Sequence, residues 1–439
     1  MSRPKRRRDQ ARTVAFRVLR AVTADGAYAN LELARQRAEL SGADATFTTE
    51  LVSGTCRAMG SYDQVIERAS GRPLKSLQPA VVDVLRLGTH QLLAMRVPTH
   101  AAISASVDLA ALEVGERVAG VVNAVLRKVA ARDWDDWLDP LSEGLDEFGR
   151  LALVHQHPRW IVEAWSRVLP AAELADALAA DNVAPTPHLV VRPGLAEVSE
   201  LGGEPARWSP YGAYAGGDPG QLAAVDEGRA GVQDEGSQLV ALALSRVDAP
   251  DGWWLDLCAG PGGKSALLAG LAREQGGSLV AAELQEHRAR LVADNLRAYP
   301  DPKPVCLVAD GTRPAWRSGG FSKVLADVPC TGLGALRRRP ESRWRRRPED
   351  LPGLIELQGK LLASAIAATA PGGVVAYVTC SPHPDETAAV VAGASGVVTL
   401  RAADYLPEVP NCASGDFVQL WPHRHGTDAM FLALLRRST

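Results

Sequence analysis

The sequence predicts a doubly wound α/β domain preceded by a separate all-helical domain. From residue 253 to residue 380, short apolar runs alternate with helical patterns, which is typical of a parallel sheet covered by helices. Residues 12 to about 135 instead repeat apolar side chains at helical spacing, without any alternating strand pattern. We therefore expect a helical domain over 1–135, a helical linker region over 136–183 and an α/β domain over 184–439.

The expected elements of the α/β domain follow one another in a regular order. A short strand at 188–193 and a helix over 239–244 come first. Leu291 and Leu296 should face inward from the second of the later helices. The remaining strands are expected over 253–258, 278–284, 305–310, 323–328 and 374–380, and the remaining helices over 264–273, 286–298 and 351–368.

Composition narrows the class of protein. The chain has 439 residues, enough for two or three domains, and its charged content of 23% is ordinary for a globular protein. The formal net charge is −3, so any nucleic-acid binding must come from local patches. The six cysteines include no CxxC pair, which argues against a disulfide framework and a zinc ribbon. No apolar run suits a signal peptide or a membrane span, so we expect a cytoplasmic protein without a membrane partner.

A glycine-rich loop joins the strand at 253–258 to the next helix. Glycines let the backbone approach a ligand closely, and the new helix offers free N–H groups. Cys258 stands where a Walker loop needs glycine, and Ser265 stands at the third glycine of a dinucleotide fingerprint. The loop fits an adenosine-type ligand such as S-adenosylmethionine, with a plain connector as the alternative. Its residues are Cys258, Ala259, Gly260, Pro261, Gly262, Gly263 and Lys264.

Acids and thiols occupy the carboxyl ends of the expected strands, where ligands bind in such sheets. Glu283 ends the second strand, and its carboxylate can accept both ribose hydroxyls of a nucleoside. Asp310 ends the third strand, where it could meet an adenine amino group. Each could instead be a solvated acid or a helix cap.

Two cysteines suggest the reaction. Asp327-Val328-Pro329-Cys330 lacks the second proline and the aromatic that are usual in amino-methyltransferases, and has a cysteine in their place. A thiolate can add to carbon 6 of cytosine, after which carbon 5 can attack an electrophilic methyl group. Asp327 and Cys330 could supply an acid and a thiol for this chemistry. Cys380 also follows an apolar strand, and a helix expected near 384–386 would favour its thiolate. The residues alone leave open which cysteine attacks.

Seven arginines and one tryptophan crowd residues 337–347. Such a segment predicts a surface that binds phosphates and stacks bases, and a solvated charged loop is the alternative. The basic tail over residues 1–8 could also touch phosphates. The candidate RNA-binding residues are Arg337, Arg338, Arg339, Arg343, Arg345, Arg346 and Arg347.

Several motifs carry a family resemblance. Residues 97–103 and 121–128 look like the helical RNA-binding domain of the antitermination factor NusB. Over nearly its whole length, the chain resembles the bacterial ribosomal RNA cytosine-C5 methyltransferases of the Sun/Fmu (RsmB) type. The motifs that resemble this family lie at 256–265, 327–347 and 377–386, with further ones at 232–238 and 422–428.

The resemblance implies roles for individual residues. It makes Cys380 the nucleophile and Cys330 the residue that assists resolution of the covalent adduct, and it turns Asp327 and Lys264 toward the target cytosine. The loop 258–264 with Glu283, Asp310 and Asp327 would line an S-adenosylmethionine site. Val328 stands where alanine is common, and Glu283 stands where aspartate is common but still reaches a ribose.

The expected partner is RNA, with 16S ribosomal RNA as the substrate. Transfer RNA is an alternative, because fold and chemistry are shared. An RNA or protein amino-methyltransferase and a non-catalytic RNA-binding assembly factor are others. His423 and His425 lack matching ligands, so we expect no metal. We also expect a monomer.

Overall fold

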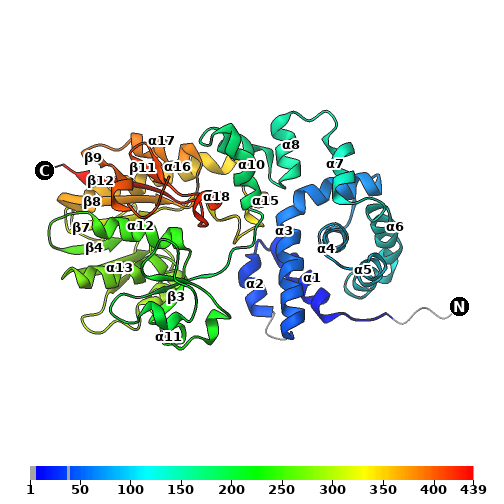
Figure 1. The fold of residues 1–439 in the computed structure, drawn as a ribbon, viewed down its shortest axis with the longest axis horizontal. Coiled ribbons are helices and arrows are strands. Elements are labelled where there is room, and N and C mark those ends of the chain that lie inside the picture. Colours follow the sequence, from blue (N-terminus) through cyan, green and yellow to red (C-terminus); the bar gives the residue numbers. More distant parts are fainter. Residues whose placement is uncertain (1–5, 37–39, 439) are drawn as a thin grey trace. The chain divides into compact units, whose positions relative to one another are not determined.

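The computed structural model describes residues 6–36 and 40–438, which form two compact units. One unit comprises the chain up to Asn182 together with Leu336–Arg346. The other comprises Val183–Ala335 and Arg347–Thr439. Figure 1 shows helices alone in the first unit and a sheet with helices in the second. The predicted order, an all-helical domain followed by a doubly wound α/β domain, is confirmed.

The helical unit is built around the long helix α3, which packs against α1, α4 and α6. Ser41 caps the start of α3, and Gly71 ends it in the left-handed conformation that favours glycine. Leu51, Tyr62 and Ile66 lie on its buried face. The helices are α1 (Gln10–Ala24), α2 (Ala29–Gln36), α3 (Gly42–Ser70), α4 (Pro79–Leu93), α5 (Thr99–Glu113), α6 (Ala119–Val129), α7 (Trp134–Ser142), α8 (Glu147–Val154), α9 (Arg159–Ser166), α10 (Ala171–Ala180) and α15 (Ser342–Arg345).

The basic tail is only partly described, because residues 1–5 lie outside the described residues. Arg6 forms ion pairs with Asp108 at 3.0 Å and with Glu116 at 2.6 Å. At this position the tail therefore contacts acids of its own unit.

Residues 336–346 lie with the helical unit, although the sequence predicted them inside the α/β domain. Arg343 is fully buried, and its Nη1 donates to the Gln156 carbonyl at 2.9 Å and to Asn182 Oδ1 at 2.8 Å. The Trp344 ring lies so close to Gly60 that a Cβ there would be 2.1 Å from it. Buried hydrogen bonds and ring packing therefore bind this segment to the helical unit.

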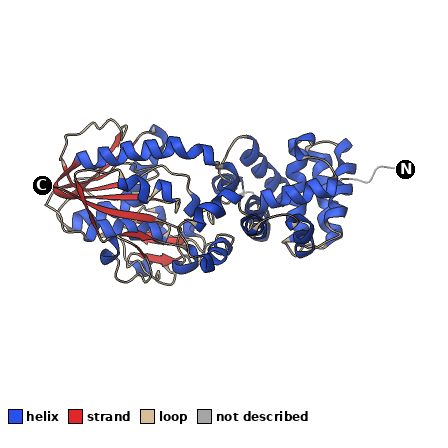
Figure 2. Ribbon diagram, turned by 90° about the horizontal axis from the view of Figure 1, so that it is seen from above, coloured by secondary structure: helices blue, strands red, loops and turns tan. Residues whose placement is uncertain are grey.

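The second unit contains a nine-stranded sheet in the order β10-β11-β12-β8-β7-β4-β5-β6, with β9 paired to β12. Strands β4 to β8 run parallel, and β12 is antiparallel to β8. Figure 2 shows helices on both sides of the strands. The strands are β4 (Trp253–Asp256), β5 (Ser278–Glu283), β6 (Val305–Val308), β7 (Phe321–Asp327), β8 (Thr369–Thr379), β9 (Val397–Leu400), β10 (Ala413–Ser414), β11 (Phe417–Gln419) and β12 (Phe431–Arg437).

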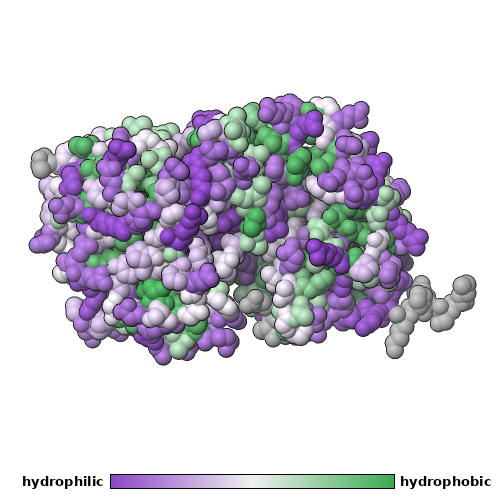
Figure 3. Space-filling view, in the orientation of Figure 1, coloured by the Kyte–Doolittle hydropathy of each residue, from purple (hydrophilic) through white to green (hydrophobic). Residues whose placement is uncertain are grey.

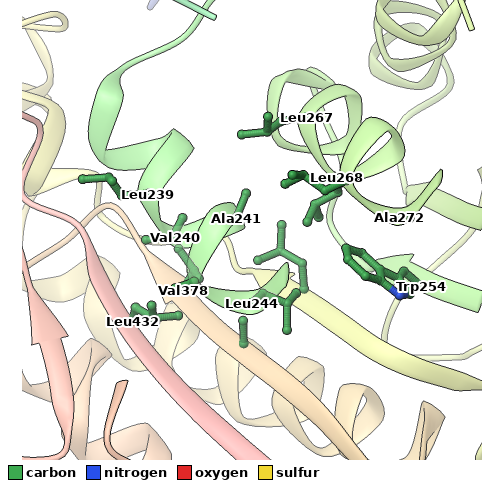
Figure 4. Close-up of a cluster of buried hydrophobic side chains, with 14 of the residues drawn as sticks. Leu239, Val240, Ala241, Leu244, Trp254, Leu267, Leu268, Ala272, Val378 and Leu432 are labelled. Atoms are coloured by element: carbon green, nitrogen blue, oxygen red, sulfur yellow. The ribbon is translucent and has the colours of Figure 1, made fainter. Parts of the chain in front are cut away.

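Alternate residues of these strands belong to two separate cores. Trp254 and Val378 pack with α12 and α13 on one face, as Figure 4 shows. Leu255 and Tyr377, one residue along, pack with α16 on the other. The helices of this unit are α11 (Ala223–Asp226), α12 (Glu235–Arg246), α13 (Gly263–Glu274), α14 (Glu286–Leu296), α16 (Leu351–Ala368), α17 (Ala388–Ala392) and α18 (Pro422–His425).

A small antiparallel sheet precedes the large one, in the order β2-β1-β3. Its central strand β1 (His188–Val191) confirms the strand predicted at 188–193, and its neighbours are β2 (Gly212–Tyr214) and β3 (Ala230–Val232). The prediction for Leu291 is wrong. Its side chain is 50% exposed, whereas Leu296 is buried as predicted. The inward face of α14 is formed by Ala289, Val292 and Leu296.

On the face drawn in Figure 3, hydrophilic side chains are widespread and hydrophobic ones form small separate groups. Across the part of the chain that the structure describes, every helix is too short or too polar to traverse a lipid bilayer.

Candidate active site

The glycine loop lies against a carboxylate of the next strand. Glu283 ends β5 and is buried, and its Oε2 accepts from the Gly260 N–H at 3.0 Å. Its Oε1 accepts from the Gln285 N–H, also at 3.0 Å. A Cβ at Gly260 would lie 2.2 Å from Oε2, so no larger residue fits there without moving Glu283. The sequence placed both residues in one site, and the structure brings them into contact.

The far side of the loop is fixed to α14. Gly262 has φ of +110°, and a Cβ there would lie 2.8 Å from Val292 Cα, so glycine is required twice over. Asn295 donates to the Pro261 carbonyl at 2.9 Å. Helix α13 begins at Gly263, directly after this turn. Within the loop, the Ala259 N–H bonds to the carbonyl of β5 residue Ala282 at 2.9 Å.

Asp256 and Ser265 join the two ends of the loop. Both are buried, and Ser265 Oγ donates to Asp256 Oδ2 at 2.6 Å. Burial raises the pKa of Asp256 to about 7, although this hydrogen bond opposes the shift. The half-buried thiol of Cys258 also has a raised pKa, because burial disfavours its thiolate. Cys258 is therefore a neutral member of the loop.

Asp310 follows β6 and forms a local turn. Its Oδ1 accepts from the Thr312 N–H at 2.9 Å and from the Thr312 hydroxyl at 2.7 Å. These bonds lower the pKa of Asp310. No helix begins here among the described residues, so the turn is not the helix cap that the sequence allowed as an alternative, and it leaves the carboxylate ionised after β6.

Lys264 and Asp327 form an ion pair at the centre of the site. Lys264 Nζ lies 2.8 Å from Asp327 Oδ2, at the end of β7. Burial lowers the pKa of Lys264, but attraction and hydrogen bonding to Asp327 outweigh it, so the net shift is upward. The lysine is therefore a fixed positive charge at neutral pH.

The two predicted cysteines also meet. Cys330 Sγ lies 3.4 Å from Cys380 Sγ, and both thiols are free. The hydrogen bond from Cys330 and the charge of Lys264 lower the pKa of Cys380, against burial and against the carboxylates of Asp327 and Asp428. The pKa of Cys330 is raised by its bond to Cys380 and by burial. The directions of the two shifts favour a thiolate on Cys380 and a thiol on Cys330, although the contact itself allows either sulfur to be the donor.

Glu386 supports both cysteine loops and was not singled out from the sequence. It is fully buried beneath the loops that follow β7 and β8. Its carboxylate accepts hydrogen bonds from Thr331, Ser381 and Gln358. The only sequence signal was that Glu386 lies inside the motif at 377–386. The motif does not indicate which residues its carboxylate contacts.

The predicted arginine surface is smaller than expected. Arg337 and Arg343 are buried, so neither is an exposed arginine of this segment. Arg339 and Arg345 lie over the Tyr28 ring, 5.0 Å and 5.3 Å from its centroid. The exposed or half-exposed members are Arg338, Arg339, Arg345, Arg346 and Arg347.

Trp344 and the side chains that could bind a metal were also considered from the sequence. Trp344 is half-buried, and its Nε1 donates to the Arg57 carbonyl at 3.1 Å, so it packs inside the unit rather than offering a free stacking face. Among the described residues, no three His, Cys, Asp or Glu side chains gather closely enough to hold a metal ion.

A parallel sheet with a glycine loop and acids at its strand ends defines a Rossmann-like methyltransferase fold. The family model described as 16S rRNA methyltransferase RsmB/F matches residues 241–436, and that of the NusB family matches residues 9–131. The chain belongs to the RsmB/F family of methyltransferases and carries a NusB-family domain. The resemblance to the Sun/Fmu (RsmB) type is thereby confirmed.

Similar proteins span the whole chain. A relative in Mycobacterium tuberculosis is 50% identical over 100% of this chain and 99% of the relative's length. Its name describes a methyltransferase and states no substrate. The ribosomal RNA small subunit methyltransferase B of Pseudomonas putida is 32% identical over 87% of each chain. The crystal structure of PH0851 has a TM-score of 0.78 at 23% identity and covers 100% of both chains, which shows the shared fold.

Proposed function

We propose that this protein methylates carbon 5 of a cytosine in ribosomal RNA, with 16S ribosomal RNA as the substrate and S-adenosylmethionine as the methyl donor. The observation that carries the proposal is the pair of thiols 3.4 Å apart with opposite shifts of pKa. Carbon 5 of cytosine is a poor nucleophile until a thiolate adds to carbon 6. A site with one favoured thiolate and one proton-bearing thiol suits that chemistry.

The proposed cofactor residues fit the chemistry of an adenosine ligand. Each oxygen of Glu283 accepts from one backbone N–H, and Arg288 Nη1 lies 3.5 Å from Oε2; each oxygen has a second lone pair that can accept from a ribose hydroxyl. Gly260 has no side chain that would cover this carboxylate. We assign the loop 258–264 with Glu283, Asp310 and Asp327 to S-adenosylmethionine, which when bound supplies an electrophilic methyl group.

Cys380 is the proposed nucleophile. Its thiolate forms the carbon–sulfur bond at carbon 6, and the electron pair of the 5,6 double bond moves toward the ring nitrogen and carbonyl. Lys264 is a positive charge near this thiolate and can stabilise the negative charge that develops on the ring. Asp327, bonded to Lys264, would hold the ammonium in place and face the base.

Cys330 is the proposed base for release. Two effects that raise its pKa, the hydrogen bond to Cys380 and the charge of Cys380, belong to the free thiolate. Both disappear when Cys380 is bound to carbon 6 as a thioether, so Cys330 then loses its proton more readily. Cys330 first loses its own proton to solvent, and its thiolate then takes the proton from carbon 5. The electron pair of the broken C–H bond re-forms the 5,6 double bond, and Cys380 leaves as a thiolate.

Bisulfite sequencing of total RNA tests the substrate and the position on the base. RNA from a strain lacking the protein is compared with RNA from the same strain carrying the gene or its Cys380→Ala variant. We expect one cytosine of 16S ribosomal RNA to lose its protection without the active protein. Lost protection in transfer RNA would replace the substrate, and unchanged protection everywhere would overturn the proposed reaction.

A further inference from the structure

A single buried carboxylate links the loops that carry the two thiols. Glu386 Oε1 accepts from the Thr331 N–H at 2.8 Å and from Gln358 Nε2 at 2.9 Å. Its Oε2 accepts from the Thr331 hydroxyl, and from Ser381 Oγ at 2.7 Å. Thr331 directly follows Cys330, and Ser381 directly follows Cys380. Each cysteine is therefore one residue away from a donor to Glu386.

Other bonds close the same arrangement. Gln358 of α16 donates to the carbonyl of Pro329, the residue before Cys330, at 2.9 Å. The hydroxyls of Thr331 and Ser381 lie 3.0 Å apart, and the Gly334 N–H donates to the Cys380 carbonyl at 2.8 Å. A carboxylate with four donors in a buried site is strongly held, because losing it would leave those donors unpaired.

We propose that Glu386 is a positioning residue that keeps Cys330 beside Cys380 and, through its negative charge, directs the thiolate to Cys380 rather than Cys330. The proposal rests on the proposed function for the roles of the two thiols. Its own content concerns which sulfur carries the charge in the free protein.

The charges around the two sulfurs support this direction. The carboxylates of Glu386 and Asp327 both raise the pKa of Cys330, after its bond to Cys380 and its burial. Two of the four donor groups on Glu386 belong to Thr331, directly after Cys330, whereas the Cys380 loop contributes only the Ser381 hydroxyl. Asp327 acts against a thiolate on either sulfur, whereas Glu386 acts mainly on Cys330. Glu386 therefore raises the pKa of Cys330 more than the pKa of Cys380.

Pulse labelling with iodoacetamide, read by peptide mass spectrometry, tests the proposal without RNA or cofactor. In the wild type we expect Cys380 to be alkylated before Cys330. Glu386→Gln removes the charge and keeps the shape, and it should raise the ratio of Cys330 to Cys380 labelling at least about threefold, the effect of half a pKa unit. An unchanged ratio in the folded variant would overturn the proposal.

The control is Glu235→Gln, another fully buried glutamate in the same unit. Glu235 accepts from the backbone N–H groups of Trp208 and Ser209. The Glu235→Gln variant should have a lower melting temperature and an unchanged labelling ratio. A change in the ratio as large as that of Glu386→Gln would show a general effect of losing a buried carboxylate and would overturn the proposal.

If Glu386→Gln does not fold, Ser381→Ala removes one donor and keeps the charge. Loosening the sulfur contact should then move the pH midpoint of Cys380 labelling upward, and an unmoved midpoint would contradict the positioning role. The labelling experiment needs no RNA. A negative labelling result would therefore contradict the role of Glu386, whereas a negative bisulfite result would contradict the proposed reaction.

Discussion

The loops that follow β7 and β8 each place a cysteine in the same site, but the two thiols have opposite shifts of pKa. The contact with Cys380, burial and the carboxylates of Glu386 and Asp327 raise the pKa of Cys330. The contact with Cys330 and the Lys264 ammonium lower the pKa of Cys380. Because both cysteines stand at equivalent strand ends, the groups behind each loop account for the difference between their pKa shifts, and this difference supports the proposal that Cys380 is the nucleophile.

Removing the favoured thiolate should have the largest effect. Cys380→Ala should reduce methyl transfer by roughly 10⁴-fold or more, because the nucleophile and its covalent adduct are both lost. Incorporation of labelled methyl groups into RNA measures this. Cys412→Ala, a buried cysteine packed in the core beside β11, is the control and should leave transfer within about threefold, since it only shortens a small side chain. Comparable transfer by Cys380→Ala would reverse the roles of the two cysteines.

Removing the donor thiol should give a different defect. Cys330→Ala should still attack carbon 6 and accept the methyl group, but lacks the base that takes the carbon 5 proton. A protein–RNA adduct should then accumulate and survive denaturing electrophoresis. The double variant with Cys380→Ala should form none. An adduct from Cys380→Ala alone, with none from Cys330→Ala, would contradict the assignment.

The pH dependence of activity should show the effect of Lys264, the cation that lowers the pKa of Cys380. Activity should rise with pH as Cys380 ionises, and because the pKa of Cys380 is lowered, this limb should lie below the range of an ordinary thiol. Lys264→Met removes the cation that favours the thiolate, so the pKa of Cys380 should rise and the limb should move to higher pH. Lys360→Met, an exposed lysine paired with Glu356, should leave the limb in place. A limb that does not move would remove Lys264 from the activation of Cys380.

Local sequence patterns predicted the parts of the site that follow the sheet. Alternating elements placed Glu283, Asp327 and Cys380 at strand ends, and parallel pairing necessarily brings such ends to one edge. The pattern was less informative within α14, where Leu291 and Val292 are both apolar and only packing decides which is buried.

Contacts between distant segments could not be predicted in this way. Glu386 meets Thr331 across 55 positions of the chain, and its four donor groups come from three ordinary residues that form no recognisable motif together. The burial of Arg343 depends on the Asn182 side chain, 161 positions away. An arginine-rich segment has the same composition whether its guanidinium groups face water or buried carbonyls.

The arginine segment permits a final and smaller comparison, between members of one run that differ in burial. Arg347 is exposed, whereas Arg343 is buried and bonded to Gln156 and Asn182. If the exposed members bind RNA phosphates, Arg347→Ala should flatten the slope of log affinity against log salt by about 0.7 to 0.9 and leave stability nearly unchanged. Arg343→Ala should instead lower the melting temperature, because buried carbonyls lose their donor, and should leave the slope of the folded protein intact. Filter binding over a salt series and thermal unfolding measure both quantities. Equal slopes for Arg347→Ala and the wild type would mean that Arg347 only faces water, whereas a flatter slope for folded Arg343→Ala would show that the buried arginine shapes the RNA surface indirectly.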